Sequence, residues 1–308
     1  IHSLTSYGPA LLNRDDAGFA KRIPFGGVSR TRVSSQCLKR HWRTFEGKHS
    51  LSETDIPGSV RSRVTFERFV VQPLIEEGYD ERAVRTATEA YMAELLGESA
   101  KAKASKAAAK EEGEEENDLK AGQITILGKP EIRFIRQEVK TVCEEHNETF
   151  KAAGDAKKQL KAAEKDLKKS VKDRLKGEGK KNLKALVHGA GLDAALFGRM
   201  VTSDILSRVD AAVHVAHAMT VHADSSESDY FTAVDDLLQG EDGELGSGHI
   251  NSAPLTTGLF YGYTVVDVPQ LLSNLTGANR KNLDEIDAKW AAEVIKKLIH
   301  LIASVSPG

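Results

Sequence analysis

The segment from Asn13 to Arg43 constrains the fold of this 308-residue chain more than any other part of the sequence. Its only acidic residues are Asp15 and Asp16, although the whole chain has a formal net charge of -2. Its basic residues are Arg14, Lys21, Arg22, Arg30, Arg32, Lys39, Arg40 and Arg43. A cationic strip inside a near-neutral protein indicates a local binding surface for a polyanion.

The order of residue types in this segment predicts a strand that leads directly into a helix. Thr31–Ser34 has strand character, and Ser34 or Ser35 can cap the helix that follows. Lys39 and Arg43 then lie one turn apart on one helix face. Because a helix start offers backbone amides and the positive end of the helix dipole, this corner suits a phosphate group.

The paired glycines Gly26 and Gly27 stand just before the predicted strand. They allow either a close backbone approach to a ligand or an ordinary hairpin bend. The candidate residues of this corner are Asn13, Arg14, Lys21, Arg22, Gly26, Gly27, Arg30, Arg32, Ser34, Ser35, Gln36, Lys39, Arg40 and Arg43. Phosphate contacts from such residues would fix position without reading sequence, whereas the simpler alternative is a solvated strand–helix face.

Composition narrows the class of protein. Hydrophobic residues make up 40% of the chain and charged residues 29%, which is enough for a core and typical of a soluble, helix-rich protein. No apolar run reaches the length of a membrane span, and no signal peptide precedes the first strand, so we expect a cytoplasmic protein without a membrane partner. Cys37 and Cys143 are too few and too far apart for a disulfide framework or a metal site, and we expect no cofactor.

Two stretches in the middle of the chain are dominated by charge. Ser99–Gly122 is of low complexity and has few apolar residues to bury, which is typical of a mobile surface insertion. Residues 147–185 are strongly helical but weakly amphipathic. They predict either a basic helix that faces nucleic acid or a solvated helix with i,i+4 pairs such as Glu164–Lys168, and we favour the solvated helix.

In the remaining segments, some hydrophobic residues recur with the two-residue period of a strand and others with the 3.6-residue period of a helix. Ala211–His222 and Leu255–Val268 have the pattern of long strands, and a polar, glycine-rich excursion separates them. Helical spacing extends from Ser59 to Gly97 and from Leu283 to Val305. Strands and helices in this order, without a glycine-rich dinucleotide loop, predict an α+β fold.

Three histidines in the first of these strands raise the question of a metal site. Along one strand, His214 and His222 point to one face and His217 points to the other. The three side chains cannot converge without help from another segment, so we expect core or surface histidines.

Three blocks of the sequence resemble the CasC family, the crRNA-binding backbone subunit of type I-E CRISPR Cascade complexes. The blocks are LNRDD, FGG, the alternating arginines and SSQ-LKR between Leu12 and Arg40; GRMVTSD at Gly198–Asp204; and the run from His214 through DYFTAVDDL at Asp229–Leu237. Their order and spacing agree with the family, whereas the middle of the chain matches poorly. Val28 and Ser29 stand where family members can carry further basic residues.

The resemblance implies the RAMP-superfamily fold: a modified RNA-recognition-motif (ferredoxin-like) palm with an inserted helical fingers domain and a thumb protrusion. We expect palm segments at 1–57, 198–222 and 255–308, fingers at 58–197 and a thumb at 223–254. Family members continue into at least one more palm strand, so we expect the natural chain to extend past Gly308. No GFAFV-type stacking motif is present on any strand, so we expect a backbone binder rather than a base-reading platform.

The resemblance also implies contacts that residue types alone do not. Met200 has a simple interpretation as a core methionine, and Phe231 as an apolar anchor beneath a loop. The matching family residues wedge against the nucleic acid and interrupt base stacking, at a cost of roughly a few kcal/mol that wider backbone contact offsets. Arg199 and Thr202 flank the wedge and are further candidates for phosphate or sugar contact.

The implied function is that of a non-catalytic subunit in antiviral defence. Several copies would stack head to tail along the crRNA guide and kink it at regular intervals, so that the spacer pairs with target DNA. The implied partners are the guide, target DNA through the guide, neighbouring copies, other Cascade subunits and a recruited nuclease-helicase. One alternative is a metal-dependent RAMP-type ribonuclease that uses Asp15 or Asp16, and another is a free-standing RNA chaperone.

Overall fold

The computed structural model describes residues 1–97, 119–154, 156–186, 188–200, 205–233, 249–283 and 285–307. The chain forms two compact units. The first unit comprises Ile1–Glu53, Val213–Val266 and Val294–Gly308, and the second comprises Thr54–Ala212 and Asp267–Glu293. Most of the predicted insertion at Ser99–Gly122 lies outside the described residues. The predicted palm, fingers and thumb boundaries stay predictions.

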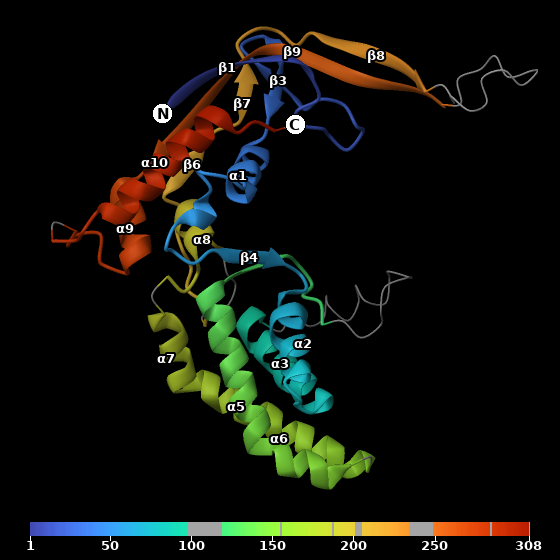
Figure 1. Cartoon of the computed structure of the whole chain (residues 1–308), viewed down its shortest axis with the longest axis vertical. Helices are drawn as coiled ribbons and strands as arrows, with labels where there is room; N and C mark the ends of the chain where they lie inside the picture. The colour runs from blue at the N-terminus through green and yellow to red at the C-terminus, as the bar shows by residue number, and fades with distance from the viewer. Residues whose placement is uncertain are drawn as a thin grey trace, which may run out of the picture. The chain divides into compact units, whose positions relative to one another are not determined.

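An antiparallel sheet forms the centre of the first unit (Figure 1). Its strands are β1 (His2–Ala10), β2 (Arg22–Phe25), β3 (Val28–Val33), β6 (Val213–Val215), β7 (Ala218–Thr220), β8 (Ser226–Ala233) and β9 (His249–Val266). The strand order is β1–β9–β7–β3–β2, and β6 and β8 pair with other parts of β9. The chain is therefore of mixed α+β class, as predicted, whereas the RNA-recognition-motif topology stays a prediction.

The core of the first unit lies on one face of this sheet. Val33, Ala218 and Phe260 are buried there and pack with Leu38 of α1 (Ser35–Thr44). Ile302 of α10 (Lys289–Ser304) lines the same small space as Val33 and Phe260. Since side chains alternate along a strand, the neighbouring residues of β1 and β9 point to the opposite face, where they are exposed.

Strand β9 begins earlier than the strand predicted at Leu255–Val268, because its first part pairs with β8. The register runs from Ser226 opposite Thr256 to Ala233 opposite His249. Figure 1 shows the two strands leaving the sheet together as a long hairpin. The polar excursion therefore begins as a β-strand, which its composition did not indicate.

The prediction of one continuous strand at Ala211–His222 was wrong. β6 and β7 each pair with β9 but are separated by Ala216 and His217. The interruption brings Nδ1 of His217 to 2.9 Å from Nη1 of Arg32 on β3. His217 therefore contacts Arg32 on the neighbouring strand β3, instead of alternating with His214 and His222 along one continuous strand.

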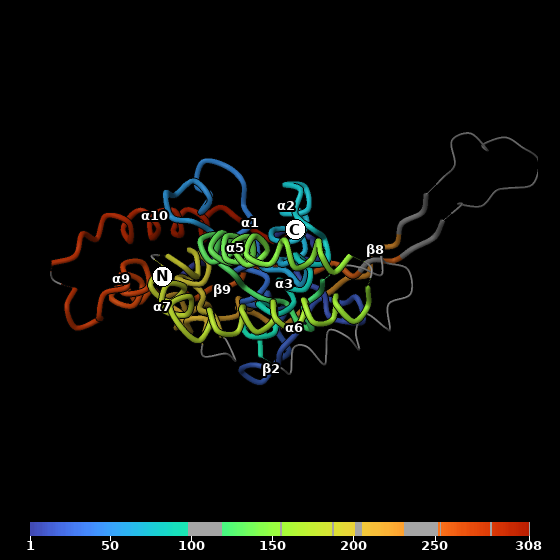
Figure 2. Tube along the Cα trace, turned by 90° about the horizontal axis from the view of Figure 1, so that it is seen from below, coloured from blue at the N-terminus to red at the C-terminus, as the bar shows by residue number. Residues whose placement is uncertain are grey.

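Helices dominate the second unit. They are α2 (Gln72–Glu76), α3 (Glu81–Leu96), α5 (Lys129–Ala153), α6 (Lys157–Lys176), α7 (Glu178–Ala185), α8 (Leu192–Phe197) and α9 (Val268–Thr276), with a π-helical turn at Glu67–Val71. α3, α5 and α6 pack on one another (Figure 2). β4 (Ser59–Ser62) and β5 (Thr125–Gly128) form a small antiparallel sheet in the same unit. No helix in the described ranges is long and apolar enough to cross a membrane.

Helix α6 has a buried apolar stripe, which corrects the weak amphipathicity expected of residues 147–185. Its buried side chains recur every four residues and are Ala163, Leu167, Val171 and Leu175. This stripe packs into the helical core, so the helix is only partly solvated. Two of its lysines face α3, where Lys168 lies 3.9 Å from Glu89 and Lys172 lies 3.8 Å from Glu94.

Candidate nucleic-acid interface

A two-residue turn at Gly26 and Gly27 joins β2 to β3. Both residues have positive φ, at 66° and 81°, and Phe25 pairs with Val28 across the turn. Positive φ at both central positions is characteristic of a type I′ turn, which glycine adopts without steric cost and which matches the twist of the strands. The hairpin bend therefore accounts for both glycines without a ligand.

Ser34 caps α1, as predicted. Its Oγ accepts a hydrogen bond of 3.2 Å from the Cys37 amide, and its own amide donates to Oδ1 of Asn13 at 2.9 Å. The Lys21 amide donates to the Asn13 carbonyl at 2.9 Å, and the Arg32 amide donates to the Lys21 carbonyl at 2.8 Å. These bonds hold the loop after β1 against the junction between β3 and α1.

Cations from the loop after β1, from β3 and from α1 influence two side chains, His217 and Cys37. Burial, together with the positive charges of Arg32, Lys21 and Lys39, lowers the pKa of His217. Burial raises the pKa of the neighbouring Cys37 thiol, against the opposing influence of Lys21 and Arg40. Lys21, Arg32, Lys39 and Arg40 thus lie around His217 and Cys37, and we call these four residues, Arg43 one turn after Lys39 and the capped start of α1 the basic corner.

Arg22 and Arg30 are engaged within the protein, in addition to Arg32, which contacts His217 and the Arg22 carbonyl. Nε of Arg22 lies 2.9 Å from Oδ2 of Asp224, and its Nη2 donates to Ser226 Oγ at 2.8 Å. Nη1 of Arg30 donates to the Thr220 carbonyl at 2.8 Å. Both side chains therefore brace the strand edge. Within the described ranges no carboxylate lies at ion-pair distance from Arg14, Arg40 or Arg43.

A hollow of about 580 Å³ lies beside the basic corner. It is lined by Asp15, Asp16, Phe19, Ala20, Lys21, Arg22 and Arg32. Oδ1 of Asp15 accepts hydrogen bonds from the amides of Ala17 and Phe19, at 3.0 and 2.9 Å, and so closes its own loop. Across the described part of the chain, no three His, Cys, Asp or Glu side chains are grouped as metal ligands.

The two wedge candidates, Met200 and Phe231, lie close to stretches outside the described residues. Met200 is 93% exposed, so it is not a core methionine, and it lines an apolar hollow with Ile124 and Leu206. The backbone of Phe231 pairs with Asn251 in the β8–β9 hairpin. The Phe231 side chain and all of Thr202 lie outside what the structure describes.

Arg199 is not available to a phosphate, which corrects the sequence prediction. Its guanidinium is buried against Glu131 of α5, with Nη1–Oε2 and Nη2–Oε1 distances of 2.6 and 2.8 Å. It also donates to the Ser207 carbonyl at 2.7 Å. No local pattern indicates this pairing, because the two residues are far apart along the chain. Arg199 is therefore not part of the candidate site.

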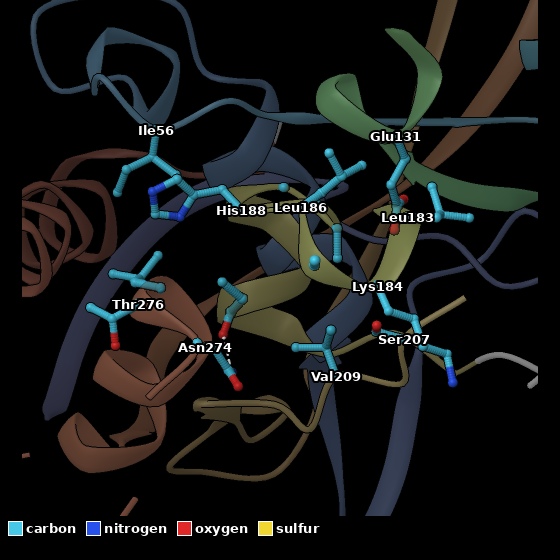
Figure 3. A pocket seen from close by; sticks show the side chains of 17 residues that line it. Ile56, Glu131, Leu183, Lys184, Leu186, His188, Ser207, Val209, Asn274 and Thr276 are labelled. Carbon is cyan, nitrogen blue, oxygen red and sulfur yellow. Dashed lines mark hydrogen bonds between the residues drawn. The ribbon is translucent and has the colours of Figure 1, made fainter. Parts of the chain in front are cut away.

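A separate hollow of about 380 Å³ lies within the second unit, among the side chains in Figure 3. Nδ2 of Asn274 on α9 donates to the carbonyls of Ala195 and Asp210, at 2.8 and 2.9 Å. Asn274 therefore ties α9 to α8 and the loop after it. None of the site residues predicted from the sequence lines this hollow.

Comparisons with known proteins give the relatives of the chain. A family model described as CT1975-like protein (Cas_CT1975) matches residues 1–308. A chain from a solved "CRISPR RNA-guided surveillance complex, pre-nicking" is 26% identical with a TM-score of 0.65, over 100% of this chain and 72% of that chain. A chain from a "CRISPR RNA-guided surveillance complex" is 23% identical with a TM-score of 0.59, over 99% and 71% respectively, and shows the likeness of fold alone. No curated protein matches.

Proposed function

Because the chain belongs to the CT1975-like protein family, we propose that it is a subunit of a CRISPR RNA-guided surveillance complex of the Cascade type. The match covers the whole chain, and the structural likeness to a subunit of such a complex extends over all of it. Within that class, the sequence blocks support the narrower assignment to a CasC-like, type I-E backbone subunit.

We propose that the basic corner holds the phosphates of the guide RNA. The observation that carries this proposal is the arrangement beside the capped start of α1, where the Arg32 guanidinium lies 2.9 Å from His217 and the Arg32 amide bonds to Lys21. Side-chain cations, helix amides and the helix dipole act on a phosphate together at such a point. These groups contact backbone rather than bases, which suits a holder for guides of many sequences.

The exposed side chain of Met200 supports its proposed role as a wedge that interrupts stacking in the guide. The β8–β9 hairpin carries Phe231, the second proposed wedge, away from the sheet. A hairpin of this kind fits the proposed thumb, which would reach the guide on a neighbouring copy. Head-to-tail contacts between copies would then generate an open arc along the RNA.

We propose that this subunit does not cut nucleic acid itself. Target DNA would pair with the guide, other Cascade subunits would complete the particle in the cytoplasm, and a recruited nuclease-helicase would supply the cleavage. The competing proposal is metal-dependent RNA hydrolysis at Asp15 or Asp16. Asp15 already accepts two backbone hydrogen bonds in its own loop, which favours a structural role for its carboxylate.

Native mass spectrometry of the full-length protein co-expressed with a repeat–spacer RNA and its neighbouring subunits tests the function. We expect a particle with several copies of the chain and protected RNA, and we expect Arg40→Glu/Arg43→Glu to reduce RNA occupancy. A protein that stays monomeric and free of RNA contradicts the proposal. RNA that is cleaved only with Mg²⁺, and is spared by Asp15→Ala or Asp16→Ala, would establish the ribonuclease instead.

A further inference from the structure

Among the described residues, the face of the first unit's sheet that lies opposite α1 and α10 carries exposed large side chains. Leu4 of β1 is 63% exposed, and Tyr261 and Tyr263 of β9 are 38% and 41% exposed. Leu259 and Val265 of β9 are exposed on the same face because they share the odd-numbered positions of the strand. α1 and α10 pack on the other face, against Val33 and Phe260. The exposed set therefore forms a contiguous aromatic and apolar surface, which we call the tyrosine face.

Strand register connects the tyrosine face to Arg32, the residue of the basic corner that lies on β3. Tyr261 is opposite Leu4 on β1 and opposite Met219 on β7. Met219 is in turn opposite Arg32 on β3, whose amide bonds to the carbonyl of Lys21. Paired residues point to the same face of a sheet. One row therefore runs from an apolar residue through a tyrosine to a cation, over strands spaced about 4.8 Å apart.

Contacts on the sheet hold the two tyrosine rings in place. The ring centroids of His2 and Tyr263 are 4.9 Å apart, with the ring planes inclined at 43°. Nδ1 of His2 lies 2.7 Å from the hydroxyl of Tyr261, within hydrogen-bonding distance. The imidazole of His2 therefore contacts both tyrosines, and each tyrosine stays partly exposed. A fixed aromatic surface loses little side-chain entropy when a flat ligand stacks on it.

We propose that the tyrosine face is a stacking platform for unpaired nucleobases of the RNA whose phosphates the basic corner holds. Exposed aromatic rings beside a cationic edge are the combination that binds single-stranded nucleic acid independently of sequence. The cation at one end of the row, Arg32, favours a polyanion, because a plain apolar protein partner would have to bury or displace its charge. This inference rests on the proposed function and adds base contact to it.

The platform departs from the expectation of a pure backbone binder. The GFAFV-type motif is absent, but LFYGY at Leu259–Tyr263 places two tyrosines on one face with Gly262 between them. A Cβ at Gly262 would lie 2.6 Å from Oγ of Ser3, so glycine leaves room for the Ser3 hydroxyl on the covered face. Both tyrosines are partly exposed on the opposite face of β9.

Binding of the full chain to two fluorescent RNAs tests the platform. One probe is a single-stranded uridine oligoribonucleotide, and the other has the same length but abasic ribose units. We expect the wild-type protein to bind the uridine RNA on the order of tenfold more tightly, since stacking of one base is worth about that factor. Tyr261→Ala/Tyr263→Ala should remove this preference, while Tyr261→Phe/Tyr263→Phe, which keeps the rings, should retain it.

Two further measurements separate the possible failures. If wild-type protein binds neither RNA, the proposed function fails and the platform with it. If Arg40→Glu/Arg43→Glu weakens binding of both RNAs but the alanine pair keeps the base preference, the function stands and the platform is wrong. The alanine pair could instead leave RNA binding unchanged and alter only the oligomeric state of the RNA-free protein. The face would then be an interface between copies, which also overturns the proposal.

Photocrosslinking with 5-iodouridine RNA tests the unaltered protein and so does not depend on the folding of a variant. We expect crosslinked peptides that contain Tyr261 or Tyr263 of β9. Crosslinks confined to the β2–β3 hairpin and α1, with none on β9, would contradict the platform even if the RNA is bound.

Discussion

Arg40 and Arg43 of the basic corner are surrounded by different groups from three cations of the second unit, Arg199, Lys168 and Lys172. In the second unit, Arg199 is buried against Glu131, and Lys168 and Lys172 of α6 face glutamates of α3. In the basic corner, the first turn of α1 contains no acidic residue, and Arg40 and Arg43 meet no carboxylate at ion-pair distance among the described residues. The density of positive charge in the sequence is therefore a weaker guide to a polyanion site than what the folded chain places around each charge.

The largest expected effect is at the buried pair. Arg199→Ala leaves the Glu131 carboxylate without its cation, so we expect a loss of about 3–5 kcal/mol in the free energy of unfolding. Urea denaturation followed by circular dichroism measures this loss. The double variant Arg199→Met/Glu131→Leu removes both charges and should lose much less. If the single and double variants are equally destabilised, packing rather than charge pairing explains the role of Arg199.

The next effect concerns α6, whose stability depends on its apolar stripe. Leu167 is fully buried, so Leu167→Ala should cost about 2–5 kcal/mol of unfolding free energy. Lys165 is exposed on the same helix, and Lys165→Ala should change stability by less than about 0.5 kcal/mol. Thermal and urea unfolding of both variants compare the two faces. A small effect at Leu167 would support the solvated helix that we favoured from the sequence.

A smaller loss is expected at the start of α1. Ser34→Ala removes the acceptor for the Cys37 amide and should cost about 1 kcal/mol of unfolding free energy. Ser34→Gly should cost only roughly a few tenths of a kcal/mol. If the cap also orders the phosphate site, Ser34→Ala lowers RNA affinity in binding titrations of folded protein. Unchanged affinity would mean that the side-chain cations act without the ordered helix start.

The smallest effect is a pH dependence at His217. Its pKa is lowered in the folded protein, so below its ordinary value of about 6.5 the unfolded chain binds more protons at this site. The contribution of His217 to stability is therefore constant above that value and declines as pH falls through it towards the lowered pKa. We expect His217→Gln to flatten this part of the stability profile. Bound RNA phosphate should raise the pKa of His217, and an NMR titration without such a shift places the phosphate elsewhere.

Local signals in the sequence predicted the local parts of the site. The Ser34 cap follows from the step between a strand pattern and a helix pattern, and it is confirmed. The pairing of Arg199 with Glu131, and the β8 strand in the polar excursion, depend on partners distant in sequence and left no local signal. The tyrosine face was missed for the same reason, since exposure at Tyr261 is set by which face α1 and α10 cover.

The salt dependence of guide RNA binding tests the central claim most directly, with two charge-reversal variants that are matched in spacing and net charge. Lys39→Glu/Arg43→Glu alters the basic corner, whereas Lys165→Glu/Lys169→Glu alters exposed lysines of α6 at the same i,i+4 spacing. We expect the first variant alone to weaken binding and to reduce the slope of log affinity against log salt by about 0.7 for each phosphate that the protein no longer neutralises. Equal reductions in both variants would show that net charge, rather than the basic corner, holds the RNA.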